Sequence, residues 1–237
     1  MKHFLKKLVL SDNQNDKPDR GSTIASRISN IHTIWHNKHQ DDVGIEKLLR
    51  LFLAASQFLF PGLYIKHFFG RRSAGVKDLA MDLYIFLKAL FPLSLIMYKW
   101  IPYEFTIIPV TWLFLETILY VPTLIFASDL IPRPSSYRRS MLLLFVNYFE
   151  IIFVYAFLYS NGNYLNVEFT NWYDPVYFSF TTLSTIGFGD YHPVTGFGKF
   201  LVCTQSLIFL SFVVLFLNFF TSKSEKKGYF GKEEDRG

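Results

Sequence analysis

The chain has 237 residues, of which 51% are hydrophobic and 19% aromatic, with 27 phenylalanines. A soluble domain of this length does not need so much apolar surface for its core, so the composition favours a membrane protein. The formal net charge of +5 is modest and gives no reason to expect a nucleic-acid partner. The single cysteine, Cys203, excludes an intramolecular disulfide.

Residues 1–78 are expected to form a cytoplasmic amino-terminal segment. The first ten residues, Met1–Leu10, are basic and amphipathic and lack a long apolar run, so no cleavable signal peptide is expected. The apolar stretch Leu51–Ile65 is too short for an ordinary span, and Pro61 and Gly62 interrupt it. We therefore predict an interfacial or re-entrant helix at 46–68. If this segment crosses the membrane instead, the amino terminus lies outside.

Four longer apolar stretches can each cross about 30 Å of hydrocarbon at about 1.5 Å per residue. They are Leu79–Tyr98, Phe105–Ile131, Met141–Tyr159 and Phe200–Phe220. The first two predict a two-helix transmembrane region at 79–132, which belongs to no family that the sequence identifies. Its second span contains no arginine, whereas a voltage sensor repeats arginine through a membrane helix, so voltage sensing by that route is not expected.

Three charged residues lie near the middle of predicted spans: Lys88 in the first, Glu116 in the second and Glu150 in the third. A charge at the centre of a bilayer costs about 2.5–3.5 kcal/mol even on lenient insertion scales. Matching depth therefore predicts that Lys88 pairs with one or both glutamates. The pair is either a structural clip that fixes helix packing or a regulatory site in which a glutamate takes up a proton. A third alternative is that the charges do not meet.

Basic residues gather on one side of the predicted spans. They precede the first span, join the second to the third and follow the fourth: Lys66, Arg71, Arg72, Lys77, Arg133, Arg138, Arg139, Lys223, Lys226, Lys227 and Lys232. Positive residues flank the cytoplasmic ends of membrane spans. Both termini are therefore predicted to be cytoplasmic in a multi-pass protein of the plasma membrane, with a short charged tail at 222–237.

The segment between the third and fourth spans contains the string T-L-S-T-I-G-F-G-D at 182–190. Its two glycines, Gly187 and Gly189, allow a positive φ at alternate positions, which turns successive carbonyls to the same side. Four such strands around an axis form rings of oxygen that replace the water shell of a cation. Upstream, Asp174 as N-cap and Pro175 at the first helical position predict a short helix over Val176–Ser184.

The string resembles the selectivity filter of potassium channels of the T-x-G-[YF]-G-D kind. The resemblance covers Met141–Phe220 and implies a pore domain at 140–221. It implies an all-α membrane protein with four transmembrane helices per subunit, a re-entrant pore helix, an extended selectivity filter and a tetrameric potassium-channel-like pore. Because each chain has one pore loop, we expect a homotetramer.

The resemblance also assigns roles to individual residues. The carbonyls of Thr185, Ile186, Gly187 and Phe188 would coordinate dehydrated K⁺, with the Thr185 hydroxyl closing the innermost site. Gly189 and Asp190 would form the outer mouth. Support from the pore helix is expected from Thr181, Thr182 and Ser184; for Ser184, satisfaction of the local backbone is an equal alternative.

Three positions depart from the family pattern. Phe188 lacks the hydroxyl with which the commoner tyrosine ties the filter to its pore helix. Thr181 stands where some relatives have a glutamate bonded to the outer-mouth aspartate, so that link is not expected. Residues 200–221 contain no glycine, so a glycine hinge cannot be assigned; Ser211 is the nearest small residue at mid-helix. A gate elsewhere, for example in the filter itself, is a hypothesis.

These observations predict a potassium-selective channel that catalyses no reaction and needs no cofactor, with K⁺ as the permeant ion and lipids as its surroundings. Two alternatives remain open at this point. One is a weakly selective cation channel on the same scaffold. The other is a non-conducting accessory or scaffold subunit that retains a pore-like loop.

Overall fold

The computed structural model describes residues 23–37, 44–71, 74–98, 102–127 and 137–224. Within these ranges the chain is helical, without strands, and carries an isolated β-bridge between Leu165 and Pro193. The predictions for residues 1–22, for the end of the second span at Ile131 and for the tail from residue 225 onward lie outside the described residues.

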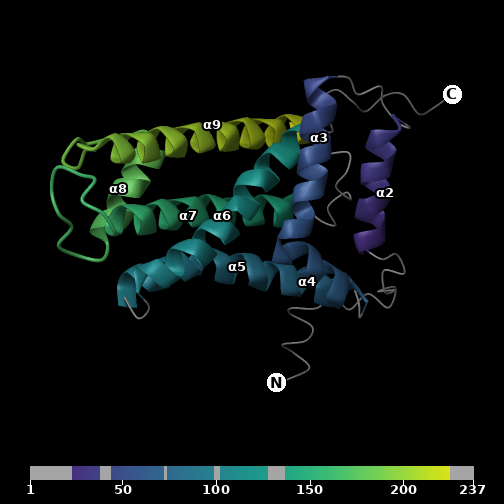
Figure 1. The fold of residues 1–237 in the computed structure, drawn as a ribbon, viewed down its shortest axis with the longest axis horizontal. Coiled ribbons are helices and arrows are strands. Elements are labelled where there is room, and N and C mark those ends of the chain that lie inside the picture. The colour runs from purple at the N-terminus through teal and green to yellow at the C-terminus, as the bar shows by residue number, and fades with distance from the viewer. Residues whose placement is uncertain (1–22, 38–43, 72–73, 99–101, 128–136, 225–237) are drawn as a thin grey trace, which may run out of the picture.

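Four helices in the described part of the chain are long and apolar enough to cross a membrane. They are α5 (Ala74–Tyr98), α6 (Tyr103–Phe126), α7 (Tyr137–Ser160) and α9 (Gly196–Ser224). The four predicted spans are thus confirmed as helices. Figure 1 shows α5, α7 and α9 running alongside one another while α6 crosses them obliquely.

Helices α5 and α7 begin before the predicted apolar stretches, and polar residues pair there, whereas α6 ends at Phe126 and does not continue to Ile131. Arg139, in the first turn of α7, forms ion pairs with Asp78 (Nη1 to Oδ2, 2.7 Å) and Asp82 (Nη2 to Oδ1, 2.6 Å) near the start of α5. The same guanidinium also donates to the Asp78 carbonyl at 2.5 Å. A planar donor set of this kind fixes two helix ends in one register.

The segment before α5, for which an interfacial or re-entrant helix is predicted at 46–68, is helical but bent next to Pro61 and Gly62. It consists of α3 (Ile45–Ser56), the 3₁₀ turn η1 (Gln57–Leu59) and α4 (Pro61–Gly70), and the two arms meet at 68°. Phe60 is extended (φ −114°, ψ 148°) because a residue before proline is excluded from the helical region. A bend of this size is typical of a broken span or a re-entrant loop.

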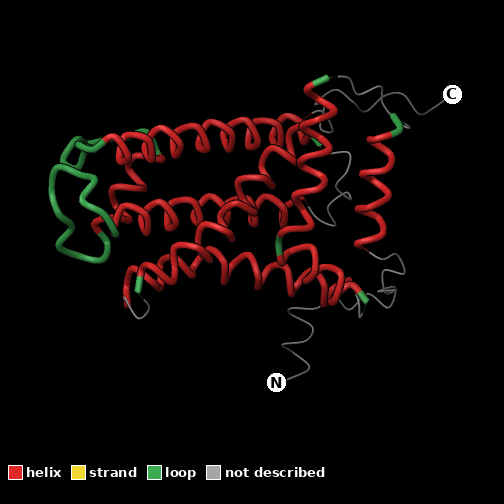
Figure 2. Tube along the Cα trace, viewed as in Figure 1, coloured by secondary structure: helices red, strands yellow, loops and turns green. Residues whose placement is uncertain are grey.

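The bent segment and the loop-rich end of the molecule lie at opposite ends of the bundle. Figure 1 shows α3 crossing the direction of the long helices beside α2 (Thr23–Trp35), at the end farthest from α8 (Asp174–Leu183). Figure 2 shows the long loops that flank α8 at the other end. The candidate pore segment and the amino-terminal helices are therefore separated by the length of the spans.

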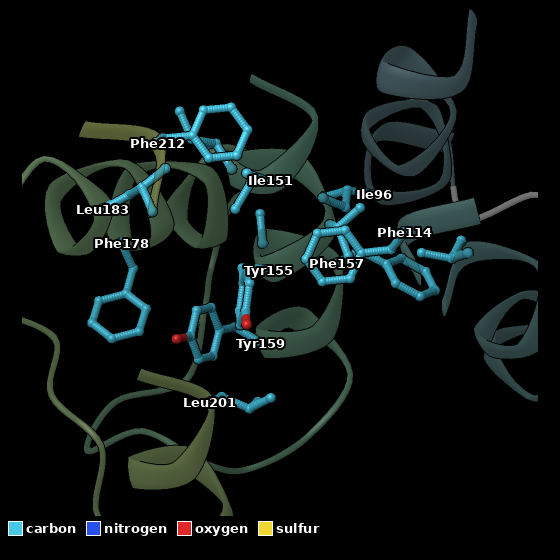
Figure 3. Close-up of a cluster of buried hydrophobic side chains, with 14 of the residues drawn as sticks. Ile96, Phe114, Ile151, Tyr155, Phe157, Tyr159, Phe178, Leu183, Leu201 and Phe212 are labelled. Carbon is cyan, nitrogen blue, oxygen red and sulfur yellow. The ribbon is translucent and has the colours of Figure 1, made fainter. Parts of the chain in front are cut away.

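The core forms around α7. One side of this helix contacts α5 and α6, where Ile96 and Phe114 are buried, and the other contacts α8 and α9 (Figure 3). Phe178 of α8 packs edge-on against Tyr159 of α7, with ring centroids 4.8 Å apart. Because lipid is as apolar as these side chains, close van der Waals packing and not removal of water holds such helices together. This packing fixes the position of α8.

Candidate functional site

The short helix α8 begins at Asp174, so the prediction that Asp174 caps a helix starting at Val176 is wrong. Tyr173 occupies the N-cap position and makes no side-chain capping bond. The Asp174 carboxylate instead turns back to the preceding loop, where Oδ2 accepts the N–H groups of Thr170 and Asn171, both at 2.8 Å. Burial alone would raise the pKa of Asp174, but these bonds and the Thr170 hydroxyl hold it below its usual value.

Residues 185–187, which directly follow α8 and its C-cap residue, cap the carboxyl end of that helix. Thr185 donates its N–H to the Thr182 carbonyl (3.2 Å), and Ile186 donates to the Thr181 carbonyl (3.0 Å). This is the paired bonding of a Schellman cap, in which the left-handed residue is usually glycine. Here that residue is Thr185, with φ +60°. A β-branched residue in this region is strained, which marks the position as a functional candidate.

Residues Thr185–Asp190, here called the filter segment, alternate in backbone handedness. Thr185, Gly187 (φ +53°) and Gly189 (φ +85°) have positive φ, whereas Ile186 and Phe188 between them do not. The alternation that the two glycines allow therefore extends one residue further, to Thr185. A Cβ at Gly187 or Gly189 would meet no atom within 4 Å, so glycine is required there for its conformation and not for space.

The filter segment is exposed in the single chain. Ile186 and Phe188 are 53% and 68% exposed, whereas Leu183, three residues before Ile186, is fully buried. Two of the three hydroxyls predicted to support the filter bind the local backbone: Thr181 donates to the Phe178 carbonyl (3.1 Å) and Ser184 to the Phe180 carbonyl (2.7 Å), which is the alternative left open for Ser184. Ser184 follows the last residue of the helix. The support comes from the carbonyls of Thr181 and Thr182.

A buried polar network that the sequence reasoning missed fastens α8 to α7 and α9. Ser179 donates to the Ile152 carbonyl (2.8 Å), and the Gln205 amide donates to the carbonyl and hydroxyl of Ser179 (both 2.9 Å). The Tyr159 hydroxyl donates to Gln205 Oε1 (2.9 Å). Ser179, Gln205 and Tyr159 are fully buried. The available signal was an amide within an apolar span, where each polar group needs a partner.

The outer part of the filter segment lies against an aromatic side chain of α8. The rings of Tyr177 and Phe188 are stacked nearly parallel, with an interplanar angle of 2° and centroids 6.3 Å apart. Tyr177 also interacts electrostatically with Asp190. A phenol is thus present beside the filter segment, on the helix and not at Phe188 itself.

The structure brings Lys88, Glu116 and Glu150, here called the charge cluster, together from α5, α6 and α7. Lys88 Nζ lies 3.4 Å from Glu150 Oε2 and 3.7 Å from Glu116 Oε2. Lys88 and Glu150 are buried, at 7% and 1% exposure. Of the alternatives open from the sequence, the one in which the charges do not meet is wrong.

Neutral groups complete the coordination of the charge cluster. Lys88 donates to Thr117 Oγ1 (2.7 Å), and that hydroxyl donates to Glu150 Oε2 (2.9 Å). The Tyr84 hydroxyl donates to Glu116 Oε2, and the Gly62 N–H, in the first turn of α4, donates to Glu116 Oε1 at 3.2 Å. Glu116 thus accepts a backbone N–H from the amino-terminal turn of α4, where N–H groups have no partner within the helix. The helix break thus contacts the cluster, which the sequence did not reveal.

Comparison with protein families yields one match. A family model described as "Ion channel" matches residues 141–226, about a third of the chain, which includes α7 from residue 141 onward, α8, the filter segment and α9. No curated protein and no solved structure matches the chain. The match indicates ion-channel function in a multi-pass membrane protein, and not an enzyme.

Proposed function

We propose that this chain is one subunit of a potassium-selective channel whose filter is residues Thr185–Gly189. The observation that supports this most directly is the alternating sign of φ at Thr185, Gly187 and Gly189. A backbone of this kind turns successive carbonyls toward one side, as a row of cation ligands requires. The match to the ion-channel family over the same residues supports the same conclusion.

In the proposed mechanism, carbonyl oxygens replace the water shell of K⁺. The carbonyls of Thr185, Ile186, Gly187 and Phe188 form successive rings, and the Thr185 hydroxyl closes the innermost site. Asp190 adds negative potential at the outer mouth. The carbonyl rings bind K⁺ tightly enough to replace its water, and repulsion between ions in adjacent sites weakens the binding enough for release.

The proposed assembly is a homotetramer, because one chain leaves its filter segment exposed. Non-helical backbone at membrane depth is tolerated only where protein buries it or where it lines a water-filled cavity. Ile186 and Phe188 are more than half exposed in the single chain, so neighbouring copies must supply this cover. In this assembly α8 is a re-entrant pore helix, α7 is the outer helix and α9 the inner helix of a pore domain at 140–221.

The proposed orientation places both termini in the cytoplasm and the filter segment at the outer face of the plasma membrane. Lys77 and Arg139 lie in the first turns of α5 and α7. Figure 1 shows that these helices begin at the end of the bundle remote from α8. The positive-inside rule assigns that end to the cytoplasm. In this scheme K⁺ is cargo, and no resident cofactor is proposed.

The test is a potassium flux assay on the purified full chain in liposomes, followed by bi-ionic potentials with K⁺ and Na⁺. We expect K⁺-selective flux that Gly187→Ala strongly reduces, since a left-handed conformation at φ +53° costs alanine about 1–2 kcal/mol relative to glycine. The matched control is Gly196→Ala. A Cβ at either glycine meets open space, but Gly196 has no positive φ, so this variant should conduct normally.

Each other outcome identifies an alternative. Flux that does not separate K⁺ from Na⁺ favours the weakly selective cation channel. Absence of flux from folded, assembled protein favours the non-conducting accessory or scaffold subunit. Equal loss of flux in Gly187→Ala and Gly196→Ala would mean that the filter segment has no special conformational role.

A further inference from the structure

The loop at 161–173, here called the outer strap, runs beside the chain that leaves the filter segment. The Asn166 N–H donates to the His192 carbonyl (3.0 Å), and the Val194 N–H donates to the Tyr164 carbonyl (2.9 Å). Leu165 and Pro193 form an antiparallel bridge between these contacts. The middle of the outer strap is thus paired with the chain at 190–194.

Within this pairing, the side chain of Asn166 reaches the end of the filter segment. Its Oδ1 accepts the His192 N–H at 2.8 Å, and its Nδ2 donates to the Asp190 carbonyl at 3.0 Å. The carboxamide therefore uses its acceptor and one donor on two backbone groups that flank Tyr191. With the backbone bond to His192, this one residue makes three hydrogen bonds to the exit of the filter segment.

The strap that presents Asn166 is itself anchored on both sides. At its carboxyl end, the Asp174 carboxylate of α8 holds the N–H groups of Thr170 and Asn171. Near its amino end, a Cβ on Gly198 in α9 would come within 2.9 Å of the Tyr164 carbonyl, so α9 packs tightly against it. The ring of Phe169 also contacts Tyr191, with centroids 5.3 Å apart. The outer strap that carries Asn166 is therefore held in place by contacts with both α8 and α9.

The two ends of the filter segment are held by different means. The inner end is capped onto α8 by the carbonyls of Thr181 and Thr182. The outer end contains Gly189 at φ +85°, and glycine has more conformational freedom than any other residue. Phe188 has no hydroxyl, and α8 contacts this end through Tyr177, which stacks on Phe188 and interacts with Asp190. The side chain of Asn166 bonds to the backbone of Asp190 and His192, and so restricts the chain directly after Gly189.

We propose that Asn166 is a positioning residue of the filter. Its carboxamide holds the Asp190 carbonyl and the His192 N–H, keeps the outer carbonyl rings in the conducting arrangement, and thereby sets K⁺ over Na⁺ selectivity and the lifetime of the conducting state. This inference rests on the proposed potassium-channel function.

Two substitutions test the role of the carboxamide. Asn166→Ala removes both side-chain bonds, and a lost bond of this type shifts an equilibrium by a factor of about five. Asn166→Asp keeps the size and the acceptor for the His192 N–H but places a carboxylate oxygen against the Asp190 carbonyl. We expect both to raise the Na⁺/K⁺ permeability ratio and to shorten the conducting lifetime by about 5–30-fold. Asn163→Ala, on the same strap, is the control and should behave as wild type.

The measurements are bi-ionic reversal potentials and the decay of K⁺ current for full-length protein in planar bilayers. Size-exclusion chromatography is the control that tests whether each variant is folded and assembled to the wild-type extent. If wild type selects K⁺ but Asn166→Asp keeps its permeability ratio and lifetime within twofold, the role of Asn166 is wrong while the proposed function stands. If wild type itself does not select K⁺, the proposed function is wrong, and with it the role of Asn166 in selectivity. Equal effects of Asn163→Ala and Asn166→Ala would also overturn the proposal.

Discussion

The filter segment and the charge cluster are both polar regions among apolar helices, but they obtain their partners differently. In the charge cluster, Lys88 and Glu150 are buried and each makes contacts within the same chain. The filter segment is exposed from Thr185 to Asp190 in the single chain. The same rule governs both, because a polar group that faces lipid without a partner costs several kcal/mol.

The difference separates folding from assembly. A chain can complete the charge cluster by bringing α4, α5, α6 and α7 together, so defects there should appear in the stability of each subunit. The filter segment needs neighbouring copies in the proposed tetramer, so defects there should appear in conduction while the subunit stays folded. Four substitutions, and one charge exchange that follows the first of them, test this separation from the largest expected effect to the smallest.

The largest expected effect is that of Lys88→Met, which breaks the charge cluster. It leaves Glu116 and Glu150 without their shared cation, and removal of one partner from a buried ion pair costs about 3–5 kcal/mol. We expect a large drop in the yield of folded protein and in its thermal midpoint in detergent. Lys199→Met, at an exposed position at the start of α9, is the control and should change the midpoint little. Equal stability of the two variants would contradict a structural role for the cluster.

A charge exchange then separates the two glutamates. Lys88→Glu combined with Glu116→Lys restores one close pair but leaves Glu150 against a new carboxylate. If the double variant is no more stable than the single variants, the partner that matters is Glu150, which is the closer of the two at 3.4 Å. Recovery to near wild type would assign the dominant pairing to Glu116.

A second, smaller effect is expected for Gln205→Leu, which disrupts the buried polar network that joins α8 to α7 and α9. The substitution leaves the Ser179 carbonyl and the Tyr159 hydroxyl without the amide that binds them, at a cost of about 1–3 kcal/mol. Because this network positions α8, thermal stability and K⁺ selectivity should fall together. A fall in stability without any change in the permeability ratio would mean that the network does not position the filter segment.

The third test connects the helix break to the charge cluster. A Cβ at Gly62 would collide with Glu116 Oε1, so Gly62→Ala must displace the carboxylate that Lys88 and Tyr84 share. Moving the end of the flexible Glu116 side chain is cheap by itself, so the cost comes from weakening its bonds to Tyr84 and Lys88, about 1–3 kcal/mol, partly offset because alanine favours a helix by about 1 kcal/mol. Thermal unfolding should show a loss relative to Gly196→Ala, whose Cβ meets open space. The reverse order would contradict the contact between α4 and Glu116.

The sequence predicted most of the fold because hydropathy determines where a membrane helix lies. It also placed Lys88, Glu116 and Glu150 at matching depth, and the structure brings them together. The depth of a residue in the membrane, which the sequence predicts, does not determine how its helix is rotated about its own axis. For that reason Thr117 and Gly62 were missed as partners, although Thr117 is adjacent to Glu116.

A local sequence pattern also does not predict which hydrogen bond forms when one side chain has two potential partners. The dipeptide Asp174-Pro175 is typical of a helix start, yet the carboxylate binds the loop before the helix because Thr170 and Asn171 present two N–H groups there. The amide of Gln205 within an apolar span indicates that it needs a partner, but the sequence does not identify Ser179 as that partner. Such choices depend on tertiary packing that a single sequence does not encode in a local pattern.

The smallest expected effect on stability is that of Thr185→Gly, and it has the opposite sign. Thr185 occupies the left-handed position of the cap on α8, where glycine is free of the strain that a β-branched residue bears. The variant should therefore be as stable as wild type or up to about 1 kcal/mol more stable, after allowing for the greater freedom of glycine in the unfolded chain. It also removes the hydroxyl proposed to close the innermost ion site, so K⁺ selectivity should fall. Thr185→Ser, which keeps the hydroxyl, should retain more selectivity than Thr185→Gly in bi-ionic measurements. If both variants select K⁺ as wild type does, the strained threonine has no role in conduction, and its presence at a position that favours glycine would need another cause.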